Sequence, residues 1–392
     1  MNNPPICKAP WVSLTLAAEG SIKPCCVWSR TSDEHISGSI HRGDTLQSAW
    51  DSLEPLRKQF LNQEMPVNCT SCKKRDATLG SSRKDWYEEK IKFVPKTWEL
   101  NPPLDLRHMD LNFGNTCNLK CRMCGSWGST AWFKEDRKLM KINPEFRRSS
   151  TYVTSPTIVP ASYWENSREV FKNLERIDFK GGEPMMQEGM YEFLEYMIEW
   201  GLARNISVAY TTNGTHRPER LKELLPYFKE VRMMISVEAV GDLYSYIRGG
   251  NVQNIQEVEE SVQWFNQFTN LVGGFNSAIQ IYNVFHLKEL YEWFDRISME
   301  NPRWKVPYMD CLVSEPKYLD INIMPDYLKA IAYDRIKDLE PKYFDNMKKS
   351  LQVNSYDPEL WELFKQFTVE LDKMRDTNVL EVLPELTGEF NG

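Results

Sequence analysis

The stretch Cys117-Asn-Leu-Lys-Cys121-Arg-Met-Cys124 carries three thiols in a CxxxCxxC spacing. Three cysteines spaced in this way can converge on one face of an iron–sulfur cube, which normally takes four ligands. One iron would then stay open to another molecule. A zinc site, or three ordinary buried cysteines, is the alternative. Zinc sites use paired CxxC or histidine spacings, however, and no histidine follows closely downstream.

A second motif follows one strand–helix unit later. Residues 174–180 have the pattern of a strand and lead into Gly181-Gly182-Glu183-Pro184. Two glycines let the backbone approach a ligand closely, and Glu183 adds an anionic acceptor suited to an ammonium group. Alone, this GGEP sequence could be a simple turn.

The two motifs in this order resemble the radical S-adenosylmethionine (radical SAM) enzymes. The resemblance implies that Cys117, Cys121 and Cys124 hold a [4Fe–4S] cluster whose open iron chelates S-adenosylmethionine. It also implies that the GGEP segment binds the methionyl amino group. The expected activity is reductive cleavage of S-adenosylmethionine to a 5′-deoxyadenosyl radical, which takes hydrogen from a substrate C–H. An electron donor such as flavodoxin or ferredoxin is the expected partner.

The fold class is predicted to be α/β, with a partial (β/α)6 radical SAM barrel over residues 100–315. Strands are predicted at residues 104–111, 174–180, 205–211, 231–237, 278–283 and 305–311, with helices that include residues 125–140, 255–268 and 287–297. Parallel connections would leave one side open for a large substrate. Residues 143–160 are predicted to be an insertion that acts as a lid, and residues 316–392 a helical C-terminal extension.

Polar residues follow the third and fourth predicted strands, on the rim where barrels of this kind carry their catalytic loops. The resemblance implies that Asn213, Ser236 and Glu238 lie near the ribose and methionyl groups of the cofactor. It also implies that Arg248 approaches the cofactor's carboxylate, an anion that a guanidinium group suits. The alternative is that the first three only cap the following helices.

A second cysteine set lies in residues 1–95. A predicted hairpin runs from residue 12 to residue 26 and carries Cys25 and Cys26, and a helix over residues 46–60 precedes Cys69-Thr-Ser-Cys72. With Cys7, this pattern resembles the half-length SPASM or twitch modules that bind an auxiliary [4Fe–4S] cluster, although such modules usually follow the barrel.

The ligands of this second cluster are expected to be Cys7, Cys25, Cys69 and Cys72. Adjacent residues in a strand point to opposite faces, so one of Cys25 and Cys26 must be chosen, and Cys25 is preferred. A zinc ribbon on the same four thiols is the alternative.

Composition excludes several other classes. The 392 residues carry a net charge of -7, which argues against a nucleic-acid partner. No run of 18 apolar residues and no signal peptide are evident, so the protein is expected in the cytoplasm, away from membranes. Nine cysteines clustered in such a chain indicate metal ligation and not disulfides.

The substrate is expected to be a peptide or a peptide-like molecule, as for many proteins with such auxiliary modules. The alternatives are an enzyme acting on a small metabolite or sugar, and a non-catalytic iron–sulfur binding or redox protein. The last would leave the GGEP segment and the rim residues unexplained.

Cys311 lies outside both cysteine sets, beside Asp310 at the end of the sixth predicted strand. We hypothesise that its thiol donates hydrogen to a substrate radical, which would give a redox-neutral reaction such as an epimerisation. The alternative is a small buried apolar residue.

Overall fold

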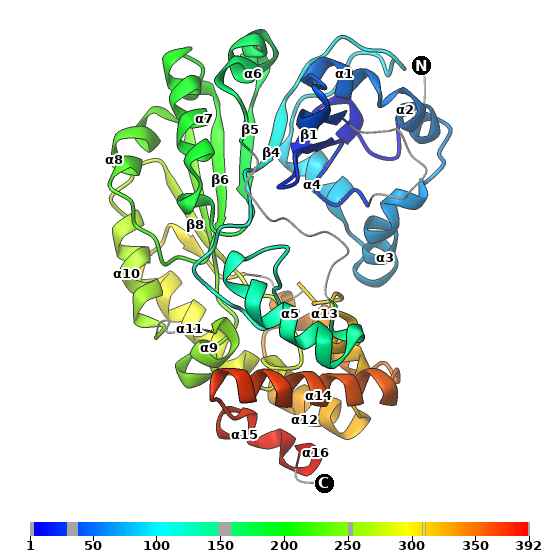
Figure 1. Ribbon diagram of the computed structural model, residues 1–392, viewed down its shortest axis with the longest axis vertical. Helices are drawn as coiled ribbons and strands as arrows, with labels where there is room; N and C mark the ends of the chain where they lie inside the picture. The colour runs from blue at the N-terminus through cyan, green and yellow to red at the C-terminus, as the bar shows by residue number, and fades with distance from the viewer. Residues whose placement is uncertain are drawn as a thin grey trace. The chain divides into compact units, whose positions relative to one another are not determined.

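The computed structural model describes residues 4–29, 38–147, 158–249, 254–307, 309 and 311–390 (Figure 1). Contacts divide the chain into two compact units. The first unit comprises Met1–Gly114, Ser155–Tyr210 and Pro218–Arg232. The second comprises Asn115–Thr154, Thr211–Arg217 and Met233–Gly392.

Nine strands are found among the described residues, and they form one sheet in the order β3-β2-β1-β4-β5-β6-β7-β8-β9. Their bounds are β1 Ser13–Leu16, β2 Ser21–Lys23, β3 Gly38–Ser39, β4 His108–Asn112, β5 Arg176–Lys180, β6 Ser207–Thr212, β7 Glu230–Ser236, β8 Leu271–Asn276 and β9 Trp304–Lys305. The mixed α/β class with a parallel sheet is confirmed. The first four predicted barrel strands correspond to β4, β5, β6 and β7.

Sixteen α-helices are found among the described residues, between the strands and after the last of them. Their bounds are α1 Leu46–Asp51, α2 Glu54–Leu61, α3 Thr70–Leu79, α4 Arg83–Lys90, α5 Phe133–Ile142, α6 Ala161–Asn166, α7 Glu188–Glu199, α8 Arg220–Leu224, α9 Gly241–Arg248, α10 Gln256–Phe265, α11 Leu287–Glu300, α12 Asp326–Ile336, α13 Pro341–Leu351, α14 Pro358–Arg375, α15 Val379–Val382 and α16 Thr387–Phe390. Among them, no helix has both the length and the apolar character required to cross a membrane.

In the first unit, the N-terminal hairpin is part of the same sheet as the barrel strands. β1 pairs antiparallel with β2 and parallel with β4, with Leu14 opposite Met109 and Leu16 opposite Leu111. All four residues of β1 are buried. The cysteine-rich N-terminal module therefore extends the sheet beyond β4.

Alternation along β4 and β5 gives the sheet one apolar and one polar face. Met109 and Ile177 are fully buried on the apolar face. The opposite face carries His108, Asp110 and Asp178. Since successive side chains of a strand point to opposite sides, this pattern places charged groups on the face turned away from the apolar core.

The fifth strand prediction was wrong in position. The strand is β8, Leu271–Asn276, and residues 278–283 follow it, with only an isolated bridge from Ile279 to Leu312. Gly273 and Gly274 weaken the strand signal in the sequence. A Cβ at Gly273 would lie 2.3 Å from a ring atom of Trp304, so the glycine makes room for β9 to pair with β8.

Several helix predictions also differ from the structure. Residues 46–60 form two helices, α1 and α2, and Pro55 lies in the first turn of the second. The helix predicted over residues 125–140 begins only at Phe133. The C-terminal extension over residues 316–392 is helical as predicted and contains α12 to α16. Residues 148–157 of the predicted lid lie outside the described residues.

Candidate iron–sulfur and cofactor site

In the second unit, donor groups surround the thiols of the CxxxCxxC loop. Arg248 Nη1 lies 3.3 Å from Cys121 Sγ, and Asn213 Nδ2 lies 3.7 Å from Cys117 Sγ. The backbone N–H of Leu119 also points to Cys117 Sγ, at 3.5 Å. Donors directed at sulfur suit thiolates that ligate a metal cluster, because such hydrogen bonds stabilise their negative charge.

Cys124, the third thiol of the loop, is packed against Gly128. A Cβ on that glycine would lie 2.9 Å from Cys124 Sγ, so a side chain there would push the sulfur aside. Cys124 N–H also donates to Cys121 O at 2.9 Å, which fixes the turn between the last two cysteines. The loop thus presents three thiols within one short, hydrogen-bonded segment.

Two of the predicted rim residues, Ser236 and Glu238, contact a third, Arg248, which lies beside Cys121. Arg248 Nε lies 3.2 Å from Glu238 Oε2, and Arg248 also donates to the backbone oxygen of Ser236. Burial raises the pKa of Glu238, although the positive charge of Arg248 acts in the opposite direction. Burial likewise raises the pKa of Cys121, and Arg248 opposes it. The guanidinium predicted to meet a cofactor carboxylate therefore already has a carboxylate and a thiol beside it.

Residues just before α5 and in its first turn form hydrogen bonds with the cysteine loop and the residues that follow it. Trp132 Nε1 donates to Cys121 O at 3.1 Å, and Ser129 Oγ donates to Leu119 O at 2.6 Å. Asp136 accepts from Ser126 N–H at 2.5 Å. These contacts explain why residues 125–129 are not helical as predicted: polar groups of Ser126 and Ser129 form hydrogen bonds that hold the cysteine loop.

Arg122, inside the cysteine motif, is fully buried and joins the loop to α9 and α14. Its Nε donates to Tyr246 O at 2.9 Å, its guanidinium lies 3.5 Å from the Tyr246 ring centroid, and it forms an ion pair with Asp372. Asp372 Oδ2 also accepts from Val379 N–H at 2.8 Å. The sequence offered no signal for this anchor.

Replacing Asp372 by asparagine is expected to destabilise the protein strongly. The change leaves the buried guanidinium of Arg122 without its counter-charge, which typically costs about 3–5 kcal/mol. Urea unfolding of the two proteins measures the difference in free energy. The matched control is Asp376→Asn at the exposed end of α14, which should change stability by about 0.5 kcal/mol or less. Equal stability of both variants would contradict the anchoring role.

In the first unit, the GGEP segment follows β5. Gly181 has φ +124°, and a Cβ there would lie 2.4 Å from Asn112 Oδ1 and 2.5 Å from Gly114 O. The preceding loop therefore already requires a residue without a side chain at this position. Gly182 N–H donates to Gly114 O at 3.1 Å, and Glu183, fully buried, accepts from Met185 N–H at 3.2 Å before Pro184 begins a short 3-10 helix.

The N-terminal cysteines also lie in the first unit, where Cys7, Cys25, Cys69 and Cys72 line one cavity. Burial raises the pKa of Cys7 to about 12 and that of Cys25 well above its usual range. A bound metal centre would deprotonate such thiols. The four thiols therefore fit an iron–sulfur cluster. Among the described residues, which include all nine cysteines, no disulfide forms.

Cys26 does not line that cavity. Burial is the main reason why the pKa of Cys26 is raised. The charged groups that also act on its thiol are Asp110, Lys180 and Arg83, which belong to β4, β5 and α4. The two adjacent cysteines thus face different surroundings, although they lie in the turn that follows β2 and not in a strand as predicted. This arrangement supports Cys25 as the fourth thiol of the N-terminal set.

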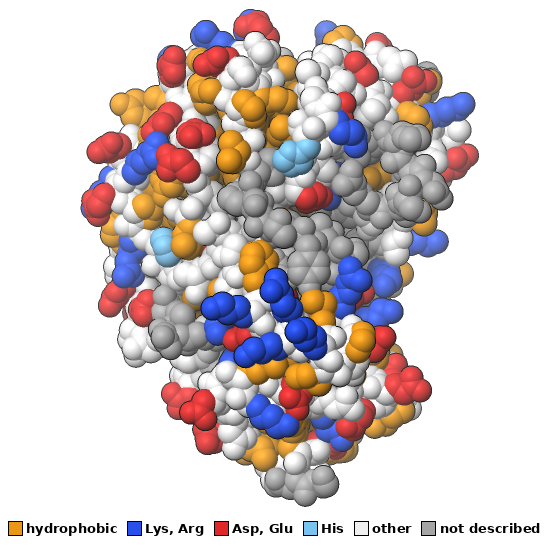
Figure 2. All heavy atoms as spheres, viewed as in Figure 1, with side chains coloured by type: hydrophobic (Ala, Val, Ile, Leu, Met, Phe, Trp, Pro, Cys, Tyr) orange, Lys and Arg blue, Asp and Glu red, His pale blue; other side chains and the backbone are white. Residues whose placement is uncertain are grey.

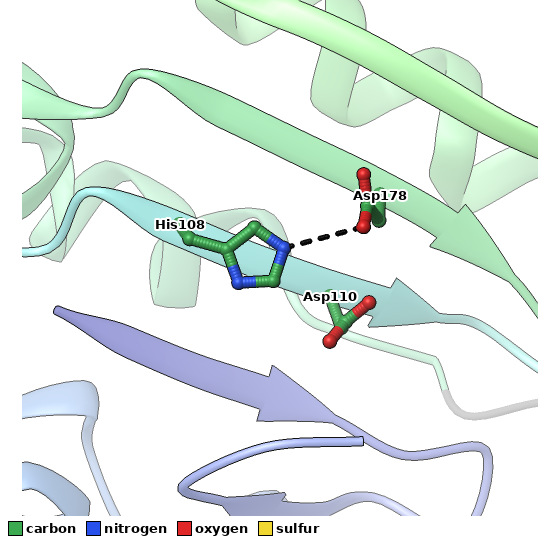
Figure 3. A group of neighbouring side chains, drawn as sticks. All are labelled: His108, Asp110 and Asp178. Carbon is green, nitrogen blue, oxygen red and sulfur yellow. Dashed lines mark hydrogen bonds and ion pairs between the residues drawn. The ribbon is translucent and has the colours of Figure 1, made fainter. Parts of the chain in front are cut away.

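The polar face of β4 and β5 gathers His108, Asp110 and Asp178, whose ligand atoms lie within 4.8 Å of one another (Figure 3). His108 Nε2 is 3.4 Å from Asp178 Oδ2, and His108 Nδ1 is 2.9 Å from Ser13 Oγ. Burial lowers the pKa of His108, so its ring is neutral at neutral pH. Residue types alone would permit a divalent metal site here.

Cations occupy the positions around both carboxylates. Arg83 Nη2 lies 3.3 Å from Asp110 Oδ2 and 3.6 Å from Asp178 Oδ2. Arg176 Nε lies 2.6 Å from Asp178 Oδ1, and Lys180 pairs with Asp110. Two carboxylates already face three positive groups, so a divalent cation would meet net repulsion. The group is therefore a buried ion-pair network.

Cys311 is exposed in the second unit, and its backbone oxygen accepts from Ile279 N–H at 2.8 Å. Its neighbour Asp310 lies outside the described residues. The hydrogen-donor role of Cys311 stays a hypothesis.

Family models match two segments of the chain. Residues 111–292 match the radical SAM superfamily, and residues 7–73 match the SPASM model, described as an iron–sulfur cluster-binding domain. The chain therefore contains a radical SAM domain. A SPASM domain precedes that domain in the sequence. The cofactors of the chain are accordingly S-adenosylmethionine, a [4Fe–4S] cluster and an auxiliary iron–sulfur cluster.

Similar solved structures share little sequence with this chain. Native anSMEcpe with bound AdoMet is 15% identical, with a TM-score of 0.44, and the match covers 62% of each chain. Streptococcus suis SuiB is 13% identical, with a TM-score of 0.39, over 95% of this chain and 73% of that one. SuiB bound to precursor peptide SuiA is 13% identical, with a TM-score of 0.36, and the match covers 82% of this chain and 64% of that one. No curated protein matches.

Proposed function

We propose that this protein is an enzyme that reductively cleaves S-adenosylmethionine and uses the resulting radical to take hydrogen from a substrate C–H. One electron enters, the sulfur–C5′ bond breaks, methionine leaves, and the 5′-deoxyadenosyl radical becomes 5′-deoxyadenosine by taking the substrate hydrogen. The observation that carries the proposal is the CxxxCxxC loop, whose sulfurs receive donors from Arg248, Asn213 and the backbone in a segment that matches the radical SAM model.

The chain's own residues have separate roles in this proposal. Cys117, Cys121 and Cys124 hold the cluster, and Asn213 stabilises the charge on its sulfurs. Arg248 lies beside Cys121 and also contacts the carboxylate group of the cofactor. Glu183 accepts a hydrogen bond from the methionyl ammonium group, and the backbone at Gly181 and Gly182 lets the cofactor approach. Arg122 and Trp132 keep the loop in one conformation, which favours a fixed distance to the substrate carbon.

For the substrate we propose a peptide or a peptide-like molecule. Many proteins with an auxiliary module of this kind act on peptides, and solved structures of SuiB and anSMEcpe include complexes with peptides. An auxiliary cluster with four thiols offers a place for the electron released when a substrate radical is oxidised. A small metabolite or sugar remains the second class to test.

The test uses protein reconstituted with iron and sulfide without oxygen and reduced with dithionite. Incubation with S-adenosylmethionine should give methionine and 5′-deoxyadenosine, separated by chromatography. Short precursor peptides encoded beside the gene are the first substrates to add, and mass spectrometry would detect the modified peptide. Reduced protein with a full iron complement that releases no 5′-deoxyadenosine, with or without peptide, would contradict the proposed activity.

Glu183→Gln and Arg248→Gln are each expected to weaken S-adenosylmethionine binding. Loss of a charge-assisted contact should cost roughly 1.5–3 kcal/mol, on the order of 10- to 100-fold in the dissociation constant, with iron retained. Equilibrium titration of the cofactor measures the effect. The control is Glu188→Gln at the exposed start of α7, which should bind like the parent. Unchanged affinity in both test variants would show that these residues do not contact the cofactor.

A further inference from the structure

Four cations share one face of α5. Lys134, Arg137, Lys138 and Lys141 follow the i, i+3, i+4, i+7 spacing of a single helix face, and all four are exposed. We refer to these four residues as the α5 basic stripe. Figure 2 shows Lys and Arg side chains gathered over this helix. A stripe of one sign is notable in a chain with a net charge of -7.

The opposite face of α5 is acidic and points inward. Glu135 is mostly buried and pairs with Lys120 at 2.6 Å and with Arg375 at 2.7 Å. Asp136 is also mostly buried and holds the cysteine loop through Ser126 N–H. Neither carboxylate is therefore directed at the stripe. The same short helix thus contacts the cysteine loop on one side and presents positive charge on the other.

The stripe lacks counter-charges within the part of the chain that the structure describes. Elsewhere on the surface many lysines and arginines pair with acidic neighbours, but no described ion pair involves any of the four stripe residues. α14 packs along α5, and its Glu362 and Glu370 are paired with lysines of their own helix, at 2.8 and 2.7 Å. Unpaired charges of one sign steer an oppositely charged partner more than they stabilise the fold.

An exposed aromatic residue follows the cysteine loop. Trp127 is 46% exposed, only three residues after Cys124. Ile142, at the end of α5, is 52% exposed. Tryptophan and arginine are enriched among the residues that carry binding energy in protein interfaces. The second unit thus offers a positive surface with large apolar side chains in the segment that holds the cluster.

We propose that the α5 basic stripe is the docking surface for a small acidic one-electron carrier protein, which delivers the electron to the cluster held by Cys117, Cys121 and Cys124. This inference rests on the proposed function, since that reaction requires an electron from outside the chain. The stripe spans about 11 Å along the helix, because seven residues rise 1.5 Å each. Such a footprint suits the small, transient interfaces of electron-transfer partners.

The experiment measures cluster reduction directly, without S-adenosylmethionine. Full-length reconstituted protein is mixed with a fully reduced flavodoxin, and loss of cluster absorbance is followed in a stopped-flow instrument at low and high salt. The test variant carries K134E, R137E, K138E and K141E. Glutamate retains a high helix propensity, so α5 should persist. A second variant carries glutamine at the same four positions and guards against a fold lost through added negative charge.

The control variant reverses four exposed lysines of the first unit, K58E, K92E, K96E and K229E, which gives the same change in net charge. Reduction by flavodoxin should fall at least about tenfold in the α5 glutamate variant and by less in the glutamine variant, because electrostatic steering contributes about 10- to 1,000-fold to such rates. The control variant should react like the parent. High salt should slow the parent and leave the α5 variants nearly unchanged.

Dithionite separates the possible causes of a slow reaction. It should reduce the cluster of every variant to the same extent, which shows that the cluster is intact. Equal flavodoxin rates for the parent and both α5 variants would overturn the docking proposal. The proposal would also be overturned if dithionite reduced the cluster of the parent protein but neither flavodoxin nor ferredoxin reduced it. Binding of single-stranded DNA to the stripe, in place of a carrier protein, would overturn it as well. Failure of S-adenosylmethionine cleavage under dithionite would contradict the proposed function and leave the docking result standing.

Discussion

Changing Cys117, Cys121 and Cys124 together to alanine is expected to abolish release of 5′-deoxyadenosine and to remove one of two clusters. The three thiols lie in one hydrogen-bonded loop, and no other cysteine of the second unit except Cys311 is available to replace them. Iron should fall by about four atoms per chain, as a [4Fe–4S] cluster is lost. Iron analysis and chromatography of the cleavage products measure the two effects.

The matched control for this triple variant is Cys311→Ala, which removes an exposed cysteine of the same unit. It should retain both clusters and cleave S-adenosylmethionine at the parent rate, even if Cys311 proves to be a hydrogen donor to the substrate, because cleavage precedes that step. Release of 5′-deoxyadenosine by the triple variant would refute the assignment of the cluster and, with it, the proposed function.

The positions of the motifs could be predicted because they depend on local patterns. Four barrel strands were predicted within a few residues, since their alternating apolar residues end at Gly, Asn and Ser segments. The fifth was misplaced because Gly273 and Gly274 are needed for close packing with Trp304, which a propensity argument cannot detect. Prediction from local sequence patterns fails where the residue type is determined by a side chain from another segment, as Trp304 determines Gly273.

Contacts between distant segments could not be predicted in the same way. Arg122 and Asp372 are 250 positions apart, and nothing in either neighbourhood marks them as partners. Likewise, the parallel pairing of β1 with β4 joins residues 95 positions apart, so the sequence identified the N-terminal module without showing that it extends the sheet. The position of Arg248 on the rim could be predicted, but its ion pair with Glu238 and its contact with Cys121 could not.

Cys25→Ala is expected to remove the auxiliary cluster, whereas Cys26→Ala should leave it in place. Cys25 lines the cavity that Cys7, Cys69 and Cys72 also line, and Cys26 lies instead beside Asp110 and Lys180. Loss of one of four thiolates should prevent stable assembly, so Cys25→Ala should lose about four iron atoms per chain and the signal of the second reduced cluster in electron paramagnetic resonance spectra.

The neighbouring positions make the pair a matched comparison, because each variant removes one half-buried cysteine from the same turn. Cys26→Ala should retain all its iron, since its thiol contacts the ion-pair network of β4 and β5 and not the cavity. Loss of iron from Cys26→Ala with full iron in Cys25→Ala would reverse the assignment. Loss from neither would mean that three cysteines and another group, or a different set of ligands, hold the auxiliary cluster.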